Sequence, residues 1–208
     1  LENVNLLANV VNRTRRRDVE ELRVVRQVKP IKLEMSSVEK TVYTSATNAI
    51  IDHAYMNELP VGFLTVTPQR MLASCMPATV QHWRKRAESL GYEDSDNFDE
   101  VSVGPLIQAL SVVTNDFPSQ DILEENDTKF NGLIHELREY FIEKPQEKII
   151  VFSTFRPTLE YLQRRLSKSG VSCLLMHGKT EDRTAAVDTF KNDPSVRVFL
   201  SSEVGSEG

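Results

Sequence analysis

Three short apolar runs constrain the fold of the second half of the chain more than any other feature. In chain order they are Ile149 to Phe152, Cys173 to Met176 and Val196 to Leu200. The starts of successive runs lie about two dozen residues apart. Such an interval is long enough for a helical crossover that returns the chain to a parallel strand. The pattern predicts an α/β fold with a parallel sheet and crossover helices.

Helical patterns fill both intervals and also precede the first run. Leu159, Leu162 and Leu166 mark the first crossover helix, and Glu181 to Phe190 forms the second behind Thr180 as its N-cap. Five apolar residues at helical spacing indicate an amphipathic helix before the sheet: Phe130, Leu133, Ile134, Leu137 and Phe141. We expect this apolar stripe to face a core.

The first half of the chain is expected to be mainly helical. Residues 24–35 predict an extended segment, after which Ser36 opens a helix with Glu39 at the spacing of a capping box. Six residues mark the apolar face of this helix: Val38, Val42, Ala46, Ala49, Ile50 and Ala54. Further helical structure is predicted over about 68–90, broken or shifted near Pro77.

Two acidic segments, 91–100 and 115–127, contain few apolar residues and are interpreted as exposed loops or linkers. A short helix is predicted between them, over about 105–113. The longest uncharged stretch, 101–115, is shorter than the roughly 20 apolar residues that a bilayer crossing needs. We therefore expect no contact with a membrane.

The composition excludes several classes of protein. With 208 residues, of which 40% are hydrophobic, the chain can fill a core and is not disordered as a whole. A net charge of -5 means that any contact with nucleic acid must be local. Cys75 and Cys173 lie far apart without the spacing of a zinc site or a disulfide framework, which favours a reducing, intracellular compartment.

Three short motifs are interpreted as structural. The GKT at 178–180 lacks the first glycine of a phosphate-binding P-loop, because Cys173 of a predicted strand occupies that position. The acidic pair at 99–100 follows a polar loop rather than an apolar strand that would hold it rigid for Mg²⁺. The SAT at 45–47 falls inside a predicted helix. None of the three predicts a nucleotide site.

The residues that follow the three apolar runs are the candidate site, since parallel sheets bind ligands outside the carboxyl ends of their strands. Hydroxyl and main-chain N–H groups there can bind phosphate oxygens without reading bases, and glycines allow close approach. These residues are Ser153, Thr180, Ser201 and Ser202, with Gly178, Gly205 and Gly208. The alternative is that serines and glycines after strands form ordinary turns.

In this order the motifs resemble the second RecA-like lobe of superfamily two helicases. VFS at 151–153 is followed by HG-x-T-x-x-R at 177–183, and then by SS-x-x-G-x-x-G at 201–208. The Swi/Snf-type DNA translocases are the most similar group, and the G-S-E-G ending is similar to the bacterial RapA-like branch. The arginine-rich run within 11–19 resembles the signature that closes the first lobe of that family.

The resemblance implies three parts: the end of a first RecA-like lobe at 1–22, an extended linker and helical insertion at 23–127, and a partial second lobe at 128–208. It implies that these residues bind nucleic acid: Ser153, Thr154, Gly178, Thr180, Arg183, Ser201 and Ser202. It implies that these residues bind ATP or couple it to nucleic acid: Gly205, Glu207 and Gly208.

The resemblance also implies cofactors and partners. The intact enzyme would use ATP and Mg²⁺ and act on double-stranded DNA, with RNA polymerase or other protein complexes as further partners, in the cytoplasm or on a bacterial nucleoid. The P-loop, the DExH-type motif and the arginine finger fall outside this sequence. We therefore expect a fragment without catalytic residues or a metal site, and ATP hydrolysis by this chain alone stays open.

Other interpretations remain open. One is a scaffolding module that binds a protein partner, and another is the lobe of an RNA helicase. The RTRRR at 13–17 is either a phosphate-binding patch or the ion-paired edge of a helix. The HWRKR at 82–86 is either a nucleic-acid contact or, as we favour, a helix face with Trp83 packed inward and the charges outward.

Overall fold

The computed structural model describes residues 28–88, 106, 110, 112–177, 180 and 182–202. The chain divides into two units, residues 1–32 and 33–208. Residues 28–32 run without helix or strand, and every element named below belongs to the second unit. The arginine-rich run at 13–17 and the predicted boundary after residue 22 lie outside the described residues.

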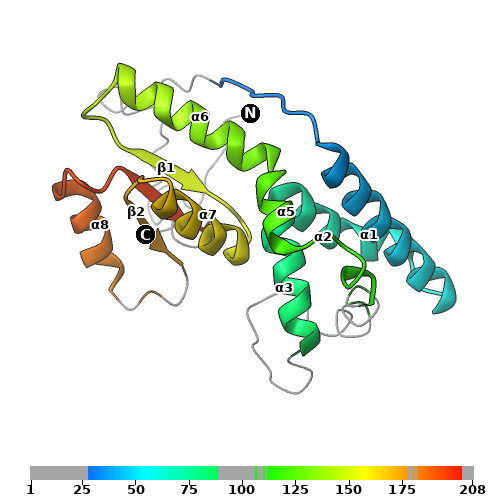
Figure 1. The fold of residues 1–208 in the computed structure, drawn as a ribbon. Coiled ribbons are helices and arrows are strands. Elements are labelled where there is room, and N and C mark those ends of the chain that lie inside the picture. Colours follow the sequence, from blue (N-terminus) through cyan, green and yellow to red (C-terminus); the bar gives the residue numbers. More distant parts are fainter. Residues whose placement is uncertain are drawn as a thin grey trace, which may run out of the picture. The chain divides into compact units, whose positions relative to one another are not determined.

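Three parallel strands form the sheet (Figure 1). They are β1 (Ile149–Phe152), β2 (Cys173–Met176) and β3 (Val198–Ser201), in the order β1-β3-β2. Phe152 and Met176 both pair with Ser201 of the central strand. The three strands therefore end level with one another at one edge, and the predicted parallel α/β architecture is confirmed.

Helices cover both faces of this sheet. The first crossover helix, α7 (Arg156–Lys168), buries three leucines in one cluster with Val198 and Leu200 of β3. Successive side chains of a strand point to opposite faces, so Phe199 faces the other side. There its ring centroid lies 4.9 Å from that of Phe190 in α8 (Arg183–Asn192). Helices α7 and α8 consequently lie on opposite faces.

The amphipathic helix predicted before the sheet is α6 (Thr128–Glu143). Phe130, Ile134 and Leu137 are buried in the cluster that contains the leucines of α7. Leu133 and Phe141 pack against that cluster and are partly buried. The helical spacing of all five residues is therefore explained by one apolar face.

Helix α8 begins later than the sequence predicted, and its N-cap is Asp182 rather than Thr180. The Asp182 carboxylate accepts a hydrogen bond from the main-chain N–H of Ala185 at 2.8 Å. Thr180 instead closes the turn after β2, where its Oγ1 accepts from the N–H of His177 at 3.0 Å. Both residue types cap helices well, and here the hydroxyl is already used by the turn.

The capping box predicted at Ser36 is present at the start of α1 (Ser37–Met56). The N–H of Glu39 donates to Ser36 Oγ at 3.2 Å, and the N–H of Ser36 donates to the Glu39 carboxylate at 2.7 Å. The predicted apolar face is also confirmed, and its fully buried members are Val42, Ala46, Ile50 and Ala54. The SAT segment at 45–47 lies inside this helix.

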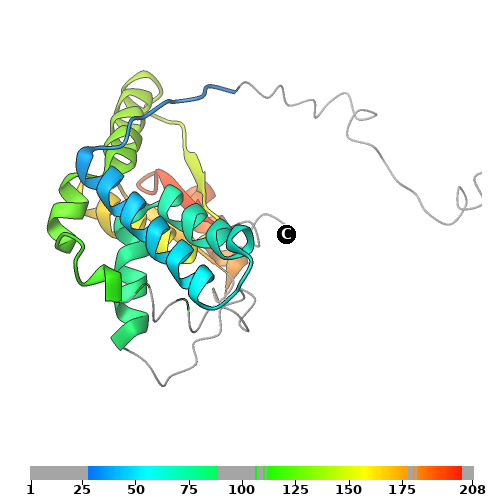
Figure 2. The ribbon, with the colours of Figure 1, turned by 90° about the vertical axis from the view of Figure 1, so that its right-hand side faces the viewer.

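The helix break predicted near Pro77 falls at Cys75, between the next two helices. Helix α2 (Val61–Ser74) contains Pro68, which the sequence placed at a helix start, and α3 (Met76–Glu88) follows after Cys75. Cys75 has an extended backbone, with φ -158° and ψ 109°. Pro77 lies in the first turn of α3, where a missing N–H removes no helical hydrogen bond. Helices α1 and α2 lie side by side (Figure 2).

The segment 115–127 is not an exposed loop, and this prediction was wrong. It contains the helix α5 (Gln120–Glu125), in which Leu123 is buried, and Phe117 is buried just before it. The side chains of Phe117 and Leu123 pack into the helical core, and the acidic segment therefore lies against that core. The segment 91–100 lies outside the described residues, and residues 112–114 are helical, in line with the helix predicted at 105–113.

Two buried clusters hold the second unit together. The first contains Ile50, Leu72, Trp83, Leu110 and Leu123 among others and lies between the helices that precede the sheet. The second lies under α6 and α7, and Cys75 and Ala78 from the helical region also belong to it. The helical region and the sheet therefore share core contacts. In the part of the chain that the structure describes, no helix has the length and hydropathy of a membrane span.

Candidate nucleic-acid interface

The carboxyl edge of the sheet brings together residues that follow different strands. The main-chain N–H of Ser153, just after β1, donates to the carbonyl oxygen of Ser201 in β3 at 3.2 Å. The turn from His177 to Thr180 follows β2, whose last residue pairs with Ser201. Of the remaining predicted site residues, Gly178, Gly205, Glu207 and Gly208 lie outside the described residues.

Ser201 and Ser202 differ in their access to a ligand. The Ser201 side chain is only 2% exposed, and its hydroxyl donates to the carbonyl oxygen of Ser202 at 3.1 Å. Ser202 is half-buried. The Ser202 side chain is therefore the more accessible of the two at this strand end.

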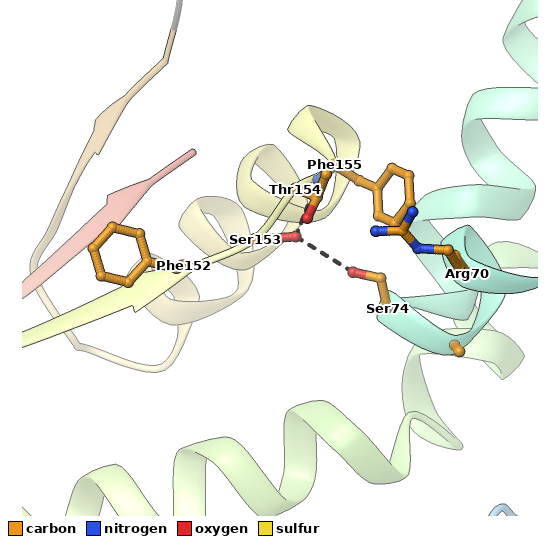
Figure 3. Close-up of a pocket in the computed structure, with 7 residues that line it drawn as sticks. Arg70, Ser74, Phe152, Ser153, Thr154 and Phe155 are labelled. Atoms are coloured by element: carbon orange, nitrogen blue, oxygen red, sulfur yellow. Dashed lines mark hydrogen bonds between the residues drawn. The ribbon is translucent and has the colours of Figure 1, made fainter. Parts of the chain in front are cut away.

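Ser153 and Thr154 open into a pocket of about 370 Å³ (Figure 3). Ser153 is half-buried and Thr154 is exposed, and the N–H of Phe155 donates to Ser153 Oγ at 3.3 Å. One wall comes from the end of β1 and the start of α7, and the other comes from the last turns of α2. The complete lining is Arg70, Ala73, Ser74, Phe152, Ser153, Thr154 and Phe155.

A chain of hydroxyl groups joins the two walls. Ser74 Oγ lies 3.3 Å from Ser153 Oγ and 3.1 Å from Thr158 Oγ1. Thr158 is 5% exposed, so this chain runs from the buried start of α7 to the open pocket. The same three residues line a second pocket of about 230 Å³, which also contains Lys129.

Arg70 is the charged residue in the lining of the larger pocket. Its guanidinium carbon lies 6.0 Å from the centroid of the Phe155 ring, within the range of a cation–π contact. Sequence reasoning missed Arg70 and Ser74, because both belong to a helix that precedes β1 by more than seventy residues. No local motif predicts that Arg70 and Ser74 lie beside the residues after β1, because this contact forms only when α2 docks on the strand end.

The part of the chain that carries this edge matches a known family. Residues 128–208 match the helicase conserved C-terminal domain. On the strength of this similarity we refer to residues 128–208 as the helicase C-terminal domain.

Curated relatives of the chain are ATP-dependent helicases. YqhH of Bacillus subtilis, an uncharacterised ATP-dependent helicase, is 23% identical over 98% of this chain, which covers 33% of YqhH. The helicase rhp16 of Schizosaccharomyces pombe is 35% identical over 36% of the chain, which covers 9% of that protein. The RNA helicase PRP5 of Meyerozyma guilliermondii is 28% identical over 51% of the chain, which covers 12% of it. The chain thus spans a third or less of these relatives.

Solved structures share the fold. The C-terminal part of the Fun30 ATPase domain matches 82% of this chain with a TM-score of 0.50 and 18% identity, and 66% of that structure is covered. The Hef helicase domain of Pyrococcus furiosus matches 86% of the chain with a TM-score of 0.51 and 17% identity, and 47% of it is covered. At these identities the two matches show a shared fold.

A buried polar cluster joins the helicase C-terminal domain to the helical region. Asp127, the N-cap of α6, accepts from the N–H of Phe130 at 2.9 Å and from the Tyr161 hydroxyl at 2.7 Å. Burial raises the pKa of Asp127, and the two hydrogen bonds oppose this. The pKa values of Tyr161 and Cys75 are also raised, chiefly by burial and further by the nearby Asp127. These thiol and phenol groups are therefore neutral parts of the core.

Glu39 makes a second connection across the same boundary. Its carboxylate accepts hydrogen bonds from both the N–H and the hydroxyl of Thr128, the first residue of α6, at 3.1 and 2.9 Å. One side chain therefore caps α1 and also anchors α6. The two connections tie the start of α6 to α1 and to α7.

The structure also describes other basic residues that the sequence offered as nucleic-acid contacts. Arg183 is exposed in the first turn of α8. Trp83 is packed inward as predicted, with 2% exposure. Arg84 was expected to point to solvent, but it is partly buried. Arg84 donates to the carbonyl oxygens of Thr114, Phe117 and Pro118 at 2.9 to 3.0 Å. The Arg84 guanidinium therefore satisfies carbonyl oxygens at and after the end of a helical segment.

Proposed function

We propose that this chain is part of an ATP-dependent DNA translocase of the Swi/Snf type, in which the helicase C-terminal domain follows the phosphate backbone of duplex DNA. The observation that carries the proposal is the level carboxyl edge of the sheet, where Ser153 lies against Ser201 and opens into a pocket. The helicase relatives and the match over 128–208 support the motor class.

Phosphate contacts suit such a motor, since it must step along any sequence. Hydroxyl and main-chain N–H groups fix a backbone without reading base edges. Ser153, Thr154 and Ser202 offer groups of this kind at the edge, and Arg183 adds an exposed cation. With a net charge of -5, binding should be weak and confined to this edge.

ATP and Mg²⁺ belong to the proposal for the whole protein. The residues that the resemblance assigns to ATP, Gly205, Glu207 and Gly208, lie outside the described part of the chain. Among the described residues, no group of three or more His, Cys, Asp or Glu side chains is placed to hold a metal ion. Bound ATP would supply the phosphoryl transfer that drives the lobes, and the residues described above would hold the nucleic acid.

The second candidate is an RNA helicase lobe, which the match to PRP5 favours. Both candidates predict phosphate contacts at the same edge, but they differ in the preferred duplex. Partners such as RNA polymerase, and a place in the cytoplasm or on a nucleoid, are further parts of the proposal.

Binding of labelled duplexes to the 208-residue chain tests the proposal. We expect weak, sequence-independent binding that unlabelled DNA duplex displaces better than RNA duplex of the same length. Thr154→Ala should weaken binding about two- to fivefold, as expected for one lost hydrogen bond of about 0.5–1 kcal/mol. Thr44→Ala, at an exposed threonine of α1, is the matched control and should leave binding unchanged. Preferential displacement by RNA would favour the second candidate, and absence of binding at low salt would contradict both.

A further inference from the structure

We propose that Arg70, Ser74 and Ser153 form a subsite that binds one backbone phosphate of nucleic acid. We call these three residues the Arg70 subsite. The inference rests on the proposed function and adds to it a cation that comes from α2, outside the helicase C-terminal domain. The helical region would then be a direct part of the nucleic-acid interface rather than only its support.

The pocket has the size and charge for such a group. Its volume of about 370 Å³ is roughly twelve times the 30 Å³ that a water molecule occupies in the liquid, so a phosphate fits together with its hydration. Arg70 is its charged lining residue, and the other polar members are hydroxyl-bearing. Arg70 and Thr154 are exposed, which makes the pocket accessible from solvent.

Arg70 is available for an anion. Among the described residues, the ion pairs of arginines involve Arg156 with Glu160, and Arg164 and Arg165 with Glu124, but none involves Arg70. Its contact with the Phe155 ring occupies no hydrogen-bond acceptor, so the guanidinium N–H donors stay available for a ligand. A planar group placed in this way suits the oxygens of a phosphate.

The hydroxyl chain adds a donor to the same pocket. Ser74, Ser153 and Thr158 carry one hydroxyl proton each, and the two hydrogen bonds among them use two of the three. One proton therefore remains for an outside acceptor. The N–H of Phe155 also donates to Ser153 Oγ, and the Ser153 hydroxyl still keeps its own proton to donate.

The chemistry favours a backbone phosphate over the triphosphate of a nucleotide. A phosphodiester carries a single negative charge, which one guanidinium and one or two hydroxyl donors match. A triphosphate is normally bound through a glycine-rich loop, a lysine and Mg²⁺. The Arg70 subsite offers one cation and no such loop.

The salt dependence of duplex binding by the 208-residue chain tests the inference. Each neutralised phosphate contributes about 0.9 to the slope of log K against log salt, so Arg70→Gln should make the slope shallower by about 0.9. The loss of this one phosphate contact should make Arg70→Gln bind duplex about eightfold more weakly than the unaltered chain near 0.1 M salt. Arg70→Lys should restore the slope, because it keeps the charge. Arg138→Gln, at an exposed arginine of α6, is the matched control and should leave the slope unchanged.

The possible results separate this inference from the proposed function. If the unaltered chain binds duplex and Arg70→Gln retains its full slope, the Arg70 subsite is wrong while the proposed function stands. If the unaltered chain binds no nucleic acid, the proposed function fails. If ATP competes with duplex for the unaltered chain and Arg70→Gln removes that competition, the subsite binds a nucleotide and the assignment to a backbone phosphate is overturned. Thermal unfolding of Arg70→Gln and Arg70→Lys should match that of the unaltered chain, since Arg70 is exposed.

Discussion

The hydroxyl oxygen of Ser74 lies 3.3 Å from that of Ser153, although 79 positions separate the two residues in the chain. Ser74 ends a helix of the helical region, and Ser153 follows the first strand of the helicase C-terminal domain. The two regions therefore meet at the residues that are expected to bind nucleic acid. Unfolding experiments measure the stability of the contact between the two regions, and binding experiments measure its affinity for a ligand.

The first prediction concerns Glu39, which is 5% exposed and accepts from the N–H of Ser36 and from two donors of Thr128. Glu39→Ala should lower the free energy of unfolding by about 2–3 kcal/mol, because it removes a cap and leaves partly buried donors without partners. Urea unfolding measures this loss. Glu34→Ala, at an exposed residue before the helix, should stay within about 0.5 kcal/mol of the unaltered chain.

The second prediction concerns Arg84, whose guanidinium donates to three main-chain carbonyl oxygens. Arg84→Ala should cost about 2–3 kcal/mol of stability, since charge-assisted hydrogen bonds are the stronger ones. The control is the exposed neighbour Lys85, whose replacement by alanine should change stability little. A direct role of Arg84 in nucleic-acid binding would instead appear as a shallower salt slope with unchanged stability.

The third prediction is a pH dependence that arises from Asp127. Burial raises the pKa of this carboxyl above its unfolded value of about 3.9, so the folded state holds its proton more tightly. The contribution of Asp127 to stability is therefore greatest at a pH below both pKa values, and falls as pH rises through the unfolded and then the folded pKa. Above the pKa of Asp127 in the folded state, its contribution to the free energy of unfolding is fully lost.

Asp127→Asn isolates this effect, because it keeps the side-chain oxygen that accepts from Phe130 but cannot titrate. The difference in unfolding free energy between the unaltered chain and Asp127→Asn should fall with rising pH above about 4 and then level off. A difference that rises with pH would mean that the folded state lowers the pKa of Asp127.

The fourth prediction is that the purified 208-residue chain does not turn over ATP. The sequence contains no complete P-loop, and its GKT at 178–180 follows the strand β2 instead of a glycine-rich turn. Phosphate release should stay at background with and without duplex DNA. DNA-stimulated release well above background would contradict this and would require a phosphate-binding site of another kind.

Much of the fold could be predicted because its determinants are local. The three strands, the face of α6 and the capping box at Ser36 all follow from residue type and spacing within a few positions. The errors arose where a local pattern competed with a contact elsewhere. Thr180 is a good N-cap, but its hydroxyl closes the preceding turn, and the buried Leu123 folds an acidic segment that was expected to be a loop.

The candidate site could be predicted only in part. Ser153 and Thr154 follow from the rule that ligands bind at the carboxyl ends of parallel strands. Arg70 and Ser74 do not, because their place in the pocket depends on the docking of α2 against the start of α7. The burial of Ser201 was also missed, because Ser201 is the last residue of the central strand β3 rather than part of an open turn.

Hydrogen exchange of the 208-residue chain with and without duplex DNA measures whether the carboxyl edge of the sheet binds the backbone of the duplex. We predict that DNA slows exchange of the main-chain amides at 153–156 and 202, and leaves the amides of α1 unchanged. Unchanged exchange at the strand ends under conditions where DNA is bound, with protection elsewhere, would contradict the account.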